Sequence, residues 1–246
     1  MLPLISPFIK TLGLLFAFIA FGLYFDSTYL IAAHPNGQWI ANVMMLAVFL
    51  YLWFKGTPRA KELMGYALLI GIGGECLFSL VFQMYEYRLQ NVPVYVPPGH
   101  AILYITTYYF CKEKAVKINK KLIEKGLLLF MLAYSSFFLL CRKDVFGFTL
   151  TLLIVFLLRH KSRERLFYFT MYLVVAFLEI VGTRYHCWVW PNTAFGIFPL
   201  LKSANPPSGI SFFYFGLDLG SLWLYKQRHR VAWHRMKVMR LRSSKT

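Results

Sequence analysis

The apolar stretch Met64–Met84, MGYALLIGIGGECLFSLVFQM, decides the fold, because it is long enough to cross a lipid bilayer and yet carries the carboxylate Glu75. A second stretch, Leu166–Thr183, LFYFTMYLVVAFLEIVGT, has the same character and carries Glu179. A helix needs about 20 apolar residues to span the hydrocarbon core, and an ionisable residue inside such a helix is costly enough to indicate a functional site. These two segments therefore predict transmembrane helices with a polar site between them.

The composition of the whole chain agrees with a membrane protein. Of its 246 residues, 58% are apolar, 19% aromatic and 15% charged, whereas charged residues make up roughly 25% of a soluble domain. These fractions exclude a soluble globular domain, a disordered chain and a disulfide-rich secreted scaffold. We therefore expect an all-α polytopic membrane protein with about eight transmembrane helices. The six further apolar segments are Thr11–Phe25, Trp39–Phe54, His100–Cys111, Gly126–Cys141, Val145–Leu158 and Ile210–Tyr225.

The distribution of positive charge predicts the orientation of these helices. The net charge is +17, from 27 Lys and Arg against 10 Asp and Glu. If the chain crosses the membrane eight times, 22 of the 27 basic residues fall on the side of the two termini and 5 on the other. Cytoplasmic segments carry the excess of Lys and Arg, so we expect a multi-pass protein of a bacterial inner membrane with both termini cytoplasmic. The charge is thereby explained without nucleic-acid binding, and the basic tail 226–246 is expected to adhere to anionic membrane lipids.

A basic cytoplasmic linker, residues 112–125, divides the chain into two four-helix halves, 1–111 and 126–225. Each half has its carboxylate in the third span, then an outward loop with an arginine, then a Pro- and Gly-containing segment before the last span. This order predicts two pseudo-repeated halves related by an axis along the membrane normal. The alternative is that the similar order arose by chance, since Pro commonly begins helices. The second outward loop, 184–209, is long and aromatic, and it is interpreted either as a lid over a pocket or as an interfacial aromatic belt.

Four of the eight spans carry polar residues along one helical face. These are the third, fourth, seventh and eighth, whereas the other four are almost uniformly apolar. Polar faces turn away from lipid, so we expect the four polar spans to surround a common cavity near the outer leaflet, with the apolar spans outside them. The alternative is a purely structural network of hydrogen bonds between helices, worth roughly 0.6–2 kcal/mol each.

The candidate catalytic residues are Glu75, His100, Glu179, His186 and Asp218. Carboxylates shielded from water hold a proton near neutrality, and together with histidine they suit general acid–base chemistry. The candidate substrate-binding residues are Gln83, Arg88, Tyr104, Tyr172, Arg184, Trp188, Trp190, Asn205 and Tyr214. We expect no metal centre, because the histidines form no HExxH motif and the four cysteines form no CxxC motif.

The arrangement of these residues favours an enzyme. A lone carboxylate costs roughly 3 kcal/mol at the centre of a span, so we expect the three carboxylates to share one site. Such a site, with aromatic faces to stabilise a cation, favours an integral membrane enzyme that acts on a hydrophobic lipid or isoprenoid substrate. The same residues fit a proton-coupled transporter of a small molecule or lipid, and a non-catalytic membrane assembly protein is a third hypothesis. The sequence indicates neither a cofactor nor an oligomeric state.

Overall fold

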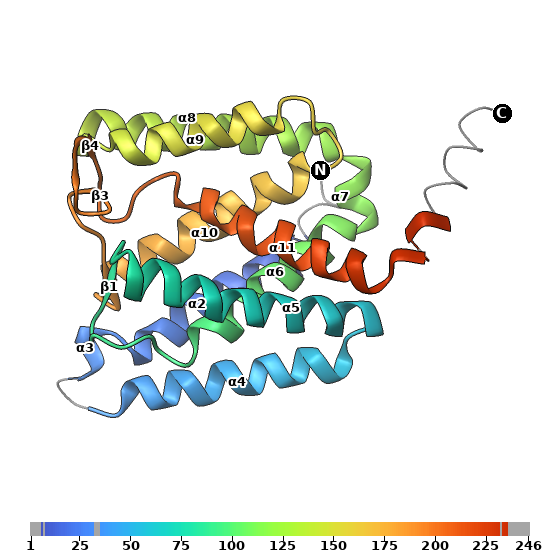
Figure 1. The fold of residues 1–246 in the computed structure, drawn as a ribbon, viewed down its shortest axis with the longest axis horizontal. Coiled ribbons are helices and arrows are strands. Elements are labelled where there is room, and N and C mark those ends of the chain that lie inside the picture. Colours follow the sequence, from blue (N-terminus) through green and yellow to red (C-terminus); the bar gives the residue numbers. More distant parts are fainter. Residues whose placement is uncertain (1–5, 7, 32–34, 232, 236–246) are drawn as a thin grey trace.

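The protein is an α-helical bundle with two small β-ribbons at one end (Figure 1). The computed structural model describes residues 6, 8–31, 35–231 and 233–235. The first half contains η1 (Phe8–Gly13), α2 (Leu14–Phe25), α3 (Thr28–Ile31), α4 (Gly37–Lys55), α5 (Pro58–Glu75), η2 (Cys76–Val81), β1 (Glu86–Tyr87) and α6 (Val96–Lys112). The second half contains α7 (Lys114–Ile118), α8 (Lys120–Arg142), α9 (Val145–Leu158), α10 (Arg165–Arg184), β2 (Trp188–Val189), β3 (Thr193–Ala194), β4 (Phe198–Lys202), η3 (Ile210–Phe213) and α11 (Tyr214–Arg228).

The predicted all-α membrane fold is confirmed at the level of its helices. Within the described residues, five helical segments are long and apolar enough to cross a membrane: Phe8–Phe25, Gly37–Lys55, Pro58–Val81, Lys120–Arg142 and Arg165–Arg184. The remaining expected segments also form helices, namely α6, α9 and η3 with α11, and α9 is a short apolar one. These helices make the chain a multi-pass membrane protein.

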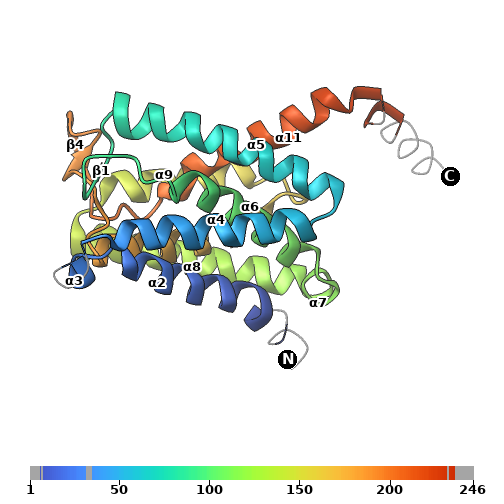
Figure 2. The same cartoon turned by 90° about the horizontal axis from the view of Figure 1, so that it is seen from below.

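Successive long helices run in alternating directions, so the connecting segments gather at two ends of the bundle (Figures 1 and 2). α3 and the four strands lie at one end, which we call the ribbon end. The opposite end, which we call the basic end, contains α7, the turn between α4 and α5, and the last turns of α11. The basic segments 55–61, 112–125 and 159–165 all belong to the basic end.

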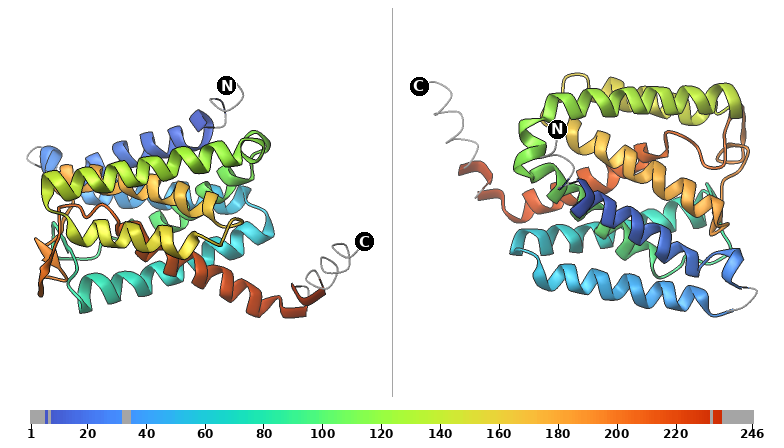
Figure 3. Two further views of the ribbon diagram at one scale, coloured as in Figure 1. Left: turned by 90° about the horizontal axis from the view of Figure 1, so that it is seen from above. Right: turned by 180° about the vertical axis from the view of Figure 1, so that it is seen from behind.

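α10 occupies the centre of the bundle. It packs against α2, α6 and α8, and its residues Tyr172, Val174 and Val175 are fully buried. α8 and α9 form a pair on one flank, and α4 lies on the opposite flank (Figure 3). α5, α6, α10 and the η3–α11 segment form a closed ring in which each member contacts the next.

α5 begins before the apolar stretch that predicted it. Thr57 Oγ1 accepts a hydrogen bond from the Ala60 amide (3.3 Å), and Pro58 lies in the first turn, where its missing N–H has no intrahelical partner to lose. Directly after Glu75, α-helical geometry gives way to the wider π-helical turns of η2. Such turns are frequent at functional sites.

Two segments expected to be connections contain regular structure. α7 and the start of α8 fall within the basic linker 112–125. The outward loop 184–209 contains β2, β3 and β4; β2 pairs antiparallel with β1, and β3 pairs with β4. Of the basic tail 226–246, for which lipid adhesion is expected, residues 236–246 lie outside the described part of the chain.

Asp144, at the N-terminus of α9, fastens the outward loop to the bundle. Its carboxylate is fully buried and accepts hydrogen bonds from the amides of Gly147 (3.1 Å), Ala204 (3.1 Å) and Ser208 (2.7 Å). The first of these bonds caps α9, and the other two hold residues 204–208 against it. The loop is therefore anchored at the side that leads into α11.

Candidate functional site

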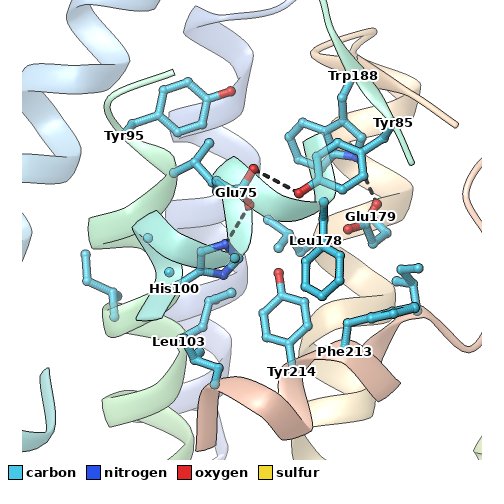
Figure 4. Close-up of a pocket in the computed structure, with 18 of the residues that line it drawn as sticks. Glu75, Tyr85, Tyr95, His100, Leu103, Leu178, Glu179, Trp188, Phe213 and Tyr214 are labelled. Carbon is cyan, nitrogen blue, oxygen red and sulfur yellow. Dashed lines mark hydrogen bonds and ion pairs between the residues drawn. The ribbon is translucent and has the colours of Figure 1, made fainter. Parts of the chain in front are cut away.

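A cavity of about 450 Å³ lies within the ring of α5, α6, α10 and α11 (Figure 4). This volume is in the range of small-molecule sites, about 300–1,000 Å³. Most of the wall is apolar, and two carboxylates and a histidine reach it: Glu75 from α5, Glu179 from α10 and His100 from α6. The aromatic residues with polar groups in the wall are Tyr85, Tyr87, Tyr95, Trp188, Trp190 and Tyr214.

The cavity wall also includes α2, which the sequence placed outside the polar spans. Leu15, Phe18 and Ile19 of α2 line the cavity, as does Met45 of α4. The expectation that the first two spans lie outside was wrong, because it relied on polar stripes. Such stripes identify only the polar part of a wall, whereas a cavity for a hydrophobic molecule is closed by apolar helices as well.

Glu75 is the last residue of α5 and is only 5% exposed. Its Oε1 lies 2.9 Å from Nε2 of His100, and its Oε2 accepts hydrogen bonds from the hydroxyls of Tyr85 and Tyr87, both at 2.8 Å. Figure 4 shows His100 and Tyr85 approaching the carboxylate from different directions, each to a different oxygen. Three partners therefore fix the orientation of the Glu75 carboxylate.

The two tyrosines act as permanent donors to this carboxylate. Both belong to the segment at the ribbon end, outside the membrane-spanning helices. Burial, reinforced by the nearby charge of Glu75, raises the pKa of Tyr85 and of Tyr87 well above the ordinary value of 10.0. Their hydroxyls thus keep their protons over the physiological pH range and donate to the carboxylate throughout it.

Glu179 lies inside α10, five residues before its end at Arg184, and is 6% exposed. Its Oε2 accepts hydrogen bonds from the indole N–H groups of Trp188 (2.8 Å) and Trp190 (2.9 Å). The ring of Trp188 lies against Gly182, where any added Cβ would overlap it. Asn205 Oδ1 accepts a hydrogen bond from the Trp190 amide (3.1 Å), so Asn205 positions an indole and stands outside the cavity wall.

The β1–β2 ribbon brings the two carboxylates' partners together. Tyr87 is directly opposite Trp188 in the register, and the rings of Tyr85 and Trp190 pack with their centroids 4.6 Å apart. Side chains two residues apart in an extended segment point to the same face. Tyr85 and Tyr87, just before and at β1, therefore both reach Glu75, and Trp188 and Trp190, at and just after β2, both reach Glu179. Glu75 and Glu179 thereby face one cavity under one aromatic cover.

The structure brings together six of the residues predicted for the site. Glu75, His100, Glu179, Trp188, Trp190 and Tyr214 line the cavity, and the rings of His100 and Tyr214 are in edge-on contact at 5.2 Å. Their chemical roles stay predictions, because no bound substrate or reaction tests them.

Asp218 does not join the other two carboxylates. It follows Tyr214 by one turn of α11, and it accepts a hydrogen bond from Tyr168 (2.5 Å) beside Tyr104. The expectation of one shared site for three carboxylates was therefore wrong. A helical repeat places Asp218 on the same face as Tyr214, but one turn nearer the basic end, where two other tyrosines satisfy it.

The remaining predicted residues lie outside the cavity wall. His186 and Arg184 are exposed at the ribbon end, where His186 Nδ1 lies 3.4 Å from Thr28 Oγ1. Gln83 is exposed in the turn after η2. Tyr172 is fully buried and shares a hydrogen bond with Thr151 of α9 (2.9 Å).

Arg88 belongs to a buried ion pair instead of the cavity. Its Nη2 lies 2.5 Å from Oδ1 of Asp26, which is completely buried at the end of α2, and its Nε donates to the Asp26 carbonyl (3.0 Å). Tyr95 (2.8 Å) and Gln38 (3.3 Å) also donate to the Asp26 carboxylate. This cluster joins α2, α4 and the segment before α6 at the ribbon end.

Sequence reasoning missed Tyr85, Tyr87 and Asp26. A signal for the tyrosines was present: the alternation Tyr85-Glu-Tyr87 matches Trp188-Val-Trp190, a period of two that is typical of strands. No local signal pointed to Asp26, since its partner Arg88 lies far along the chain and only the packing of α2 brings them together.

Within the described residues, no group of three His, Cys, Asp or Glu side chains gathers closely enough to hold a metal ion. No protein-family model, curated protein or solved structure matches the chain significantly. Function is therefore inferred from the cavity and its side chains alone.

Proposed function

We propose that this protein is an integral membrane enzyme that performs acid–base chemistry on a hydrophobic lipid or isoprenoid. The observation that carries the proposal is a pair of carboxylates that face one apolar cavity with different partners. Glu75 is held by a histidine and two phenols, and Glu179 by two indoles. Two titratable groups in unlike environments are the usual arrangement of a separate acid and base, and the apolar wall suits a substrate that partitions into the bilayer.

Glu179 is proposed as the proton donor. Both indoles bond to its Oε2, and in the described part of the chain no hydrogen bond reaches its Oε1. Oε1 is thus available to carry a proton into the cavity. The proton goes to one carbon of a C=C double bond, so that a C–H bond forms, the neighbouring carbon becomes a carbocation and Glu179 becomes a carboxylate.

His100, paired with Glu75, is proposed as the base. It takes a proton either from a carbon next to the cation, which restores a double bond in a new position, or from a water molecule that adds to the cation and yields an alcohol. The faces of Trp188, Trp190 and Tyr214 stabilise the positive charge in between. The proton on His100 returns to Glu179 before the next turnover.

This reaction leaves solvent hydrogen on a substrate carbon, which a mass spectrometer detects. Membranes containing the protein are incubated in D2O buffer with geranylgeraniol, squalene and a bacterial lipid extract, and carbon-bound deuterium is measured in the products. We expect incorporation by the natural chain and a loss of at least 100-fold in Glu179→Gln and Glu75→Gln, since a positioned acid or base contributes about 10²–10⁴-fold.

The matched control is Glu62→Gln. Glu62 pairs with His229 (2.7 Å) at the basic end and is absent from the cavity wall, so this variant should retain full incorporation. Unchanged incorporation in Glu179→Gln would contradict the proposed proton donor.

We also propose that all eight helical segments cross a bacterial inner membrane, with the basic end and both termini in the cytoplasm. The gathering of the basic segments 55–61, 112–125 and 159–165 at one end supports this orientation. Single cysteines are introduced at the exposed positions Lys202 and Lys117 in a cysteine-free background. A membrane-impermeant maleimide should label position 202 in intact cells and position 117 only after permeabilisation; labelling of position 117 in intact cells would reverse the orientation.

We further propose that the two halves arose by duplication. In each half a helix carrying a buried glutamate is followed by a short extended segment, including β1 or β2, in which two aromatic residues spaced by two return to that glutamate. The two strands then pair with each other. This correspondence extends the similar order of motifs in the sequence and supports halves related by an axis along the membrane normal.

A proton-coupled transporter is the second candidate function, and one observation favours it. Tyr104 follows His100 by one turn of α6, and Asp218 follows Tyr214 by one turn of α11, so polar groups continue from the cavity towards the basic end. Proteoliposomes with a pH gradient distinguish the two functions. Proton flux that depends on an added isoprenoid favours transport, whereas deuterium incorporation without such flux favours the enzyme.

A further inference from the structure

We propose that the cavity opens sideways into the lipid through a gap between α5 and α11, and that its occupant is an elongated apolar chain drawn from the bilayer. The inference rests on the proposed membrane enzyme, because it names the route and the shape of that enzyme's substrate. We call this gap the α5–α11 portal; Gly73 and Gly216 form its rim.

Two contacts mark the ends of the portal. Towards the basic end, Ile70 of α5 lies against Gly220 of α11, where an added Cβ would come within 2.8 Å of the Ile70 side chain. Towards the ribbon end, the rings of Phe78 and Phe213 pack with their centroids 5.1 Å apart. The two helices run in opposite directions, so between these contacts residues 73–74 of α5 face residues 216–217 of α11.

The side chains needed to close this interval are missing. Gly73, Gly74 and Gly216 all line the cavity. A Cβ placed on Gly73 or Gly216 would meet no atom within 4 Å. Glycine is unfavourable inside helices, and here it leaves the space beside both helices without a side chain at the positions that line the cavity.

The same glycines also belong to the outer surface of the bundle. Gly73 is exposed on the face of α5 that carries Leu69 and Ile72, and Gly216 is exposed on the face of α11 that carries Leu219. A residue that lies on the outer face of the bundle and also lines the cavity marks the place where the cavity opens to the outer surface. The large exposed apolar side chains around it place the portal within the hydrocarbon region of the bilayer.

The walls inside the portal fit an apolar chain whose reactive part reaches the carboxylates. Leu77, one helical turn after Gly73, and Leu217, next to Gly216, line the cavity beside the portal, whereas Glu75 and Glu179 are almost completely buried in its wall. Buried polar groups need partners, so a substrate with polar groups along its length would lose hydrogen bonds in the outer part of the cavity. A linear hydrocarbon or isoprenoid chain loses none.

The test measures the arrival of a hydrocarbon probe at the cavity without requiring catalysis. Trp188 and Trp190 are buried in the cavity wall, so they report its contents once the other four tryptophans are replaced by Phe. The protein is reconstituted in phosphatidylcholine vesicles, 1-bromohexadecane is added to the bilayer, and quenching of the remaining fluorescence is followed over time. We expect clear quenching in this parent protein.

Substitutions in the portal then decide the route. Gly73→Phe combined with Gly216→Phe should slow quenching at least tenfold, whereas Gly73→Ala with Gly216→Ala should leave it unchanged, because a methyl group fits the open space. The matched control is Gly126→Phe. Gly126 is exposed on α8, outside the cavity wall, and a Cβ there also meets nothing within 4 Å.

Two results would overturn the portal: equal quenching rates in the parent and the double Phe variant, or stronger quenching by aqueous iodide than by 1-bromohexadecane. The proposed enzyme fails separately. Undiminished deuterium incorporation in Glu179→Gln would contradict the acid–base mechanism, and it would leave the comparison of quenching rates among the portal variants unaffected.

Discussion

Arg88→Gln is expected to destabilise the protein strongly, although the sequence predicted a substrate-binding role for this arginine. Asp26 is completely buried, and Arg88, with its side chain 13% exposed, supplies its only cationic partner in the described structure. Without the guanidinium, the carboxylate keeps only the hydroxyl of Tyr95 (2.8 Å) and the amide of Gln38 (3.3 Å). Removing one partner of a buried pair costs about 3–5 kcal/mol, because the other charge is left uncompensated.

Thermal unfolding in detergent measures this cost. For a chain of this size 1 kcal/mol corresponds to a Tm change of about 2–4 °C, so Arg88→Gln should lower Tm by roughly 6–20 °C. The control is Arg184→Gln, the arginine at the similar place in the second half. Arg184 is exposed, and its substitution should change the free energy of unfolding by no more than about 0.5 kcal/mol.

The double variant Asp26→Asn with Arg88→Gln isolates the charge. It removes the buried carboxylate together with its partner, so it should recover at least half of the lost stability. A double variant as unstable as Arg88→Gln, or equal effects at Arg88 and Arg184, would refute the reasoning that an uncompensated buried charge causes the loss.

Two further predictions concern stability. The pKa of Tyr85 and of Tyr87 is raised by burial and by Glu75, so their contribution to the free energy of unfolding is complete below pH 10 and is lost as the pH rises further. Between pH 8 and 11, Tm should therefore fall less in a Tyr85→Phe/Tyr87→Phe variant than in the natural chain. Parallel curves of Tm against pH would contradict this. Asp144→Ala removes three hydrogen bonds from backbone amides and should lower the free energy of unfolding by at least about 2 kcal/mol. Tryptic cleavage at Lys202 should also become faster. The control Glu86→Ala, at an exposed strand position, should change neither the stability nor the cleavage rate.

The deuterium, labelling and quenching experiments separate three levels of inference. Deuterium incorporation tests the chemistry of Glu75 and Glu179, cysteine labelling tests the orientation in the membrane, and quenching tests the route into the cavity. The labelling variants at Lys202 and Lys117 should change neither of the other two readouts, whereas closing the portal should also lower deuterium incorporation, because the substrate enters through it.

The sequence determined the helical membrane fold and the positions of its helices. Apolar length is a local property, so Met64–Met84 and Leu166–Thr183 identified the helices that carry the two buried glutamates. Polar periodicity, which is read within one segment, picked out four helices from which Glu75, His100, Glu179 and Tyr214 reach the cavity. The cost of charge in lipid then singled out Glu75 and Glu179, and both reach the cavity.

The tertiary structure alone decided which polar groups meet and where the cavity lies. Asp218 has the same sequence signature as Glu179, yet it is satisfied by Tyr168 one turn away from the cavity, since depth along a helix depends on how neighbouring helices are shifted against it. Arg88 and Arg184 occupy similar places in the two halves, but only Arg88 meets a buried partner, Asp26, which α2 delivers from a distant part of the chain. Contacts of this kind are set by packing between segments, and no pattern within a single segment records them.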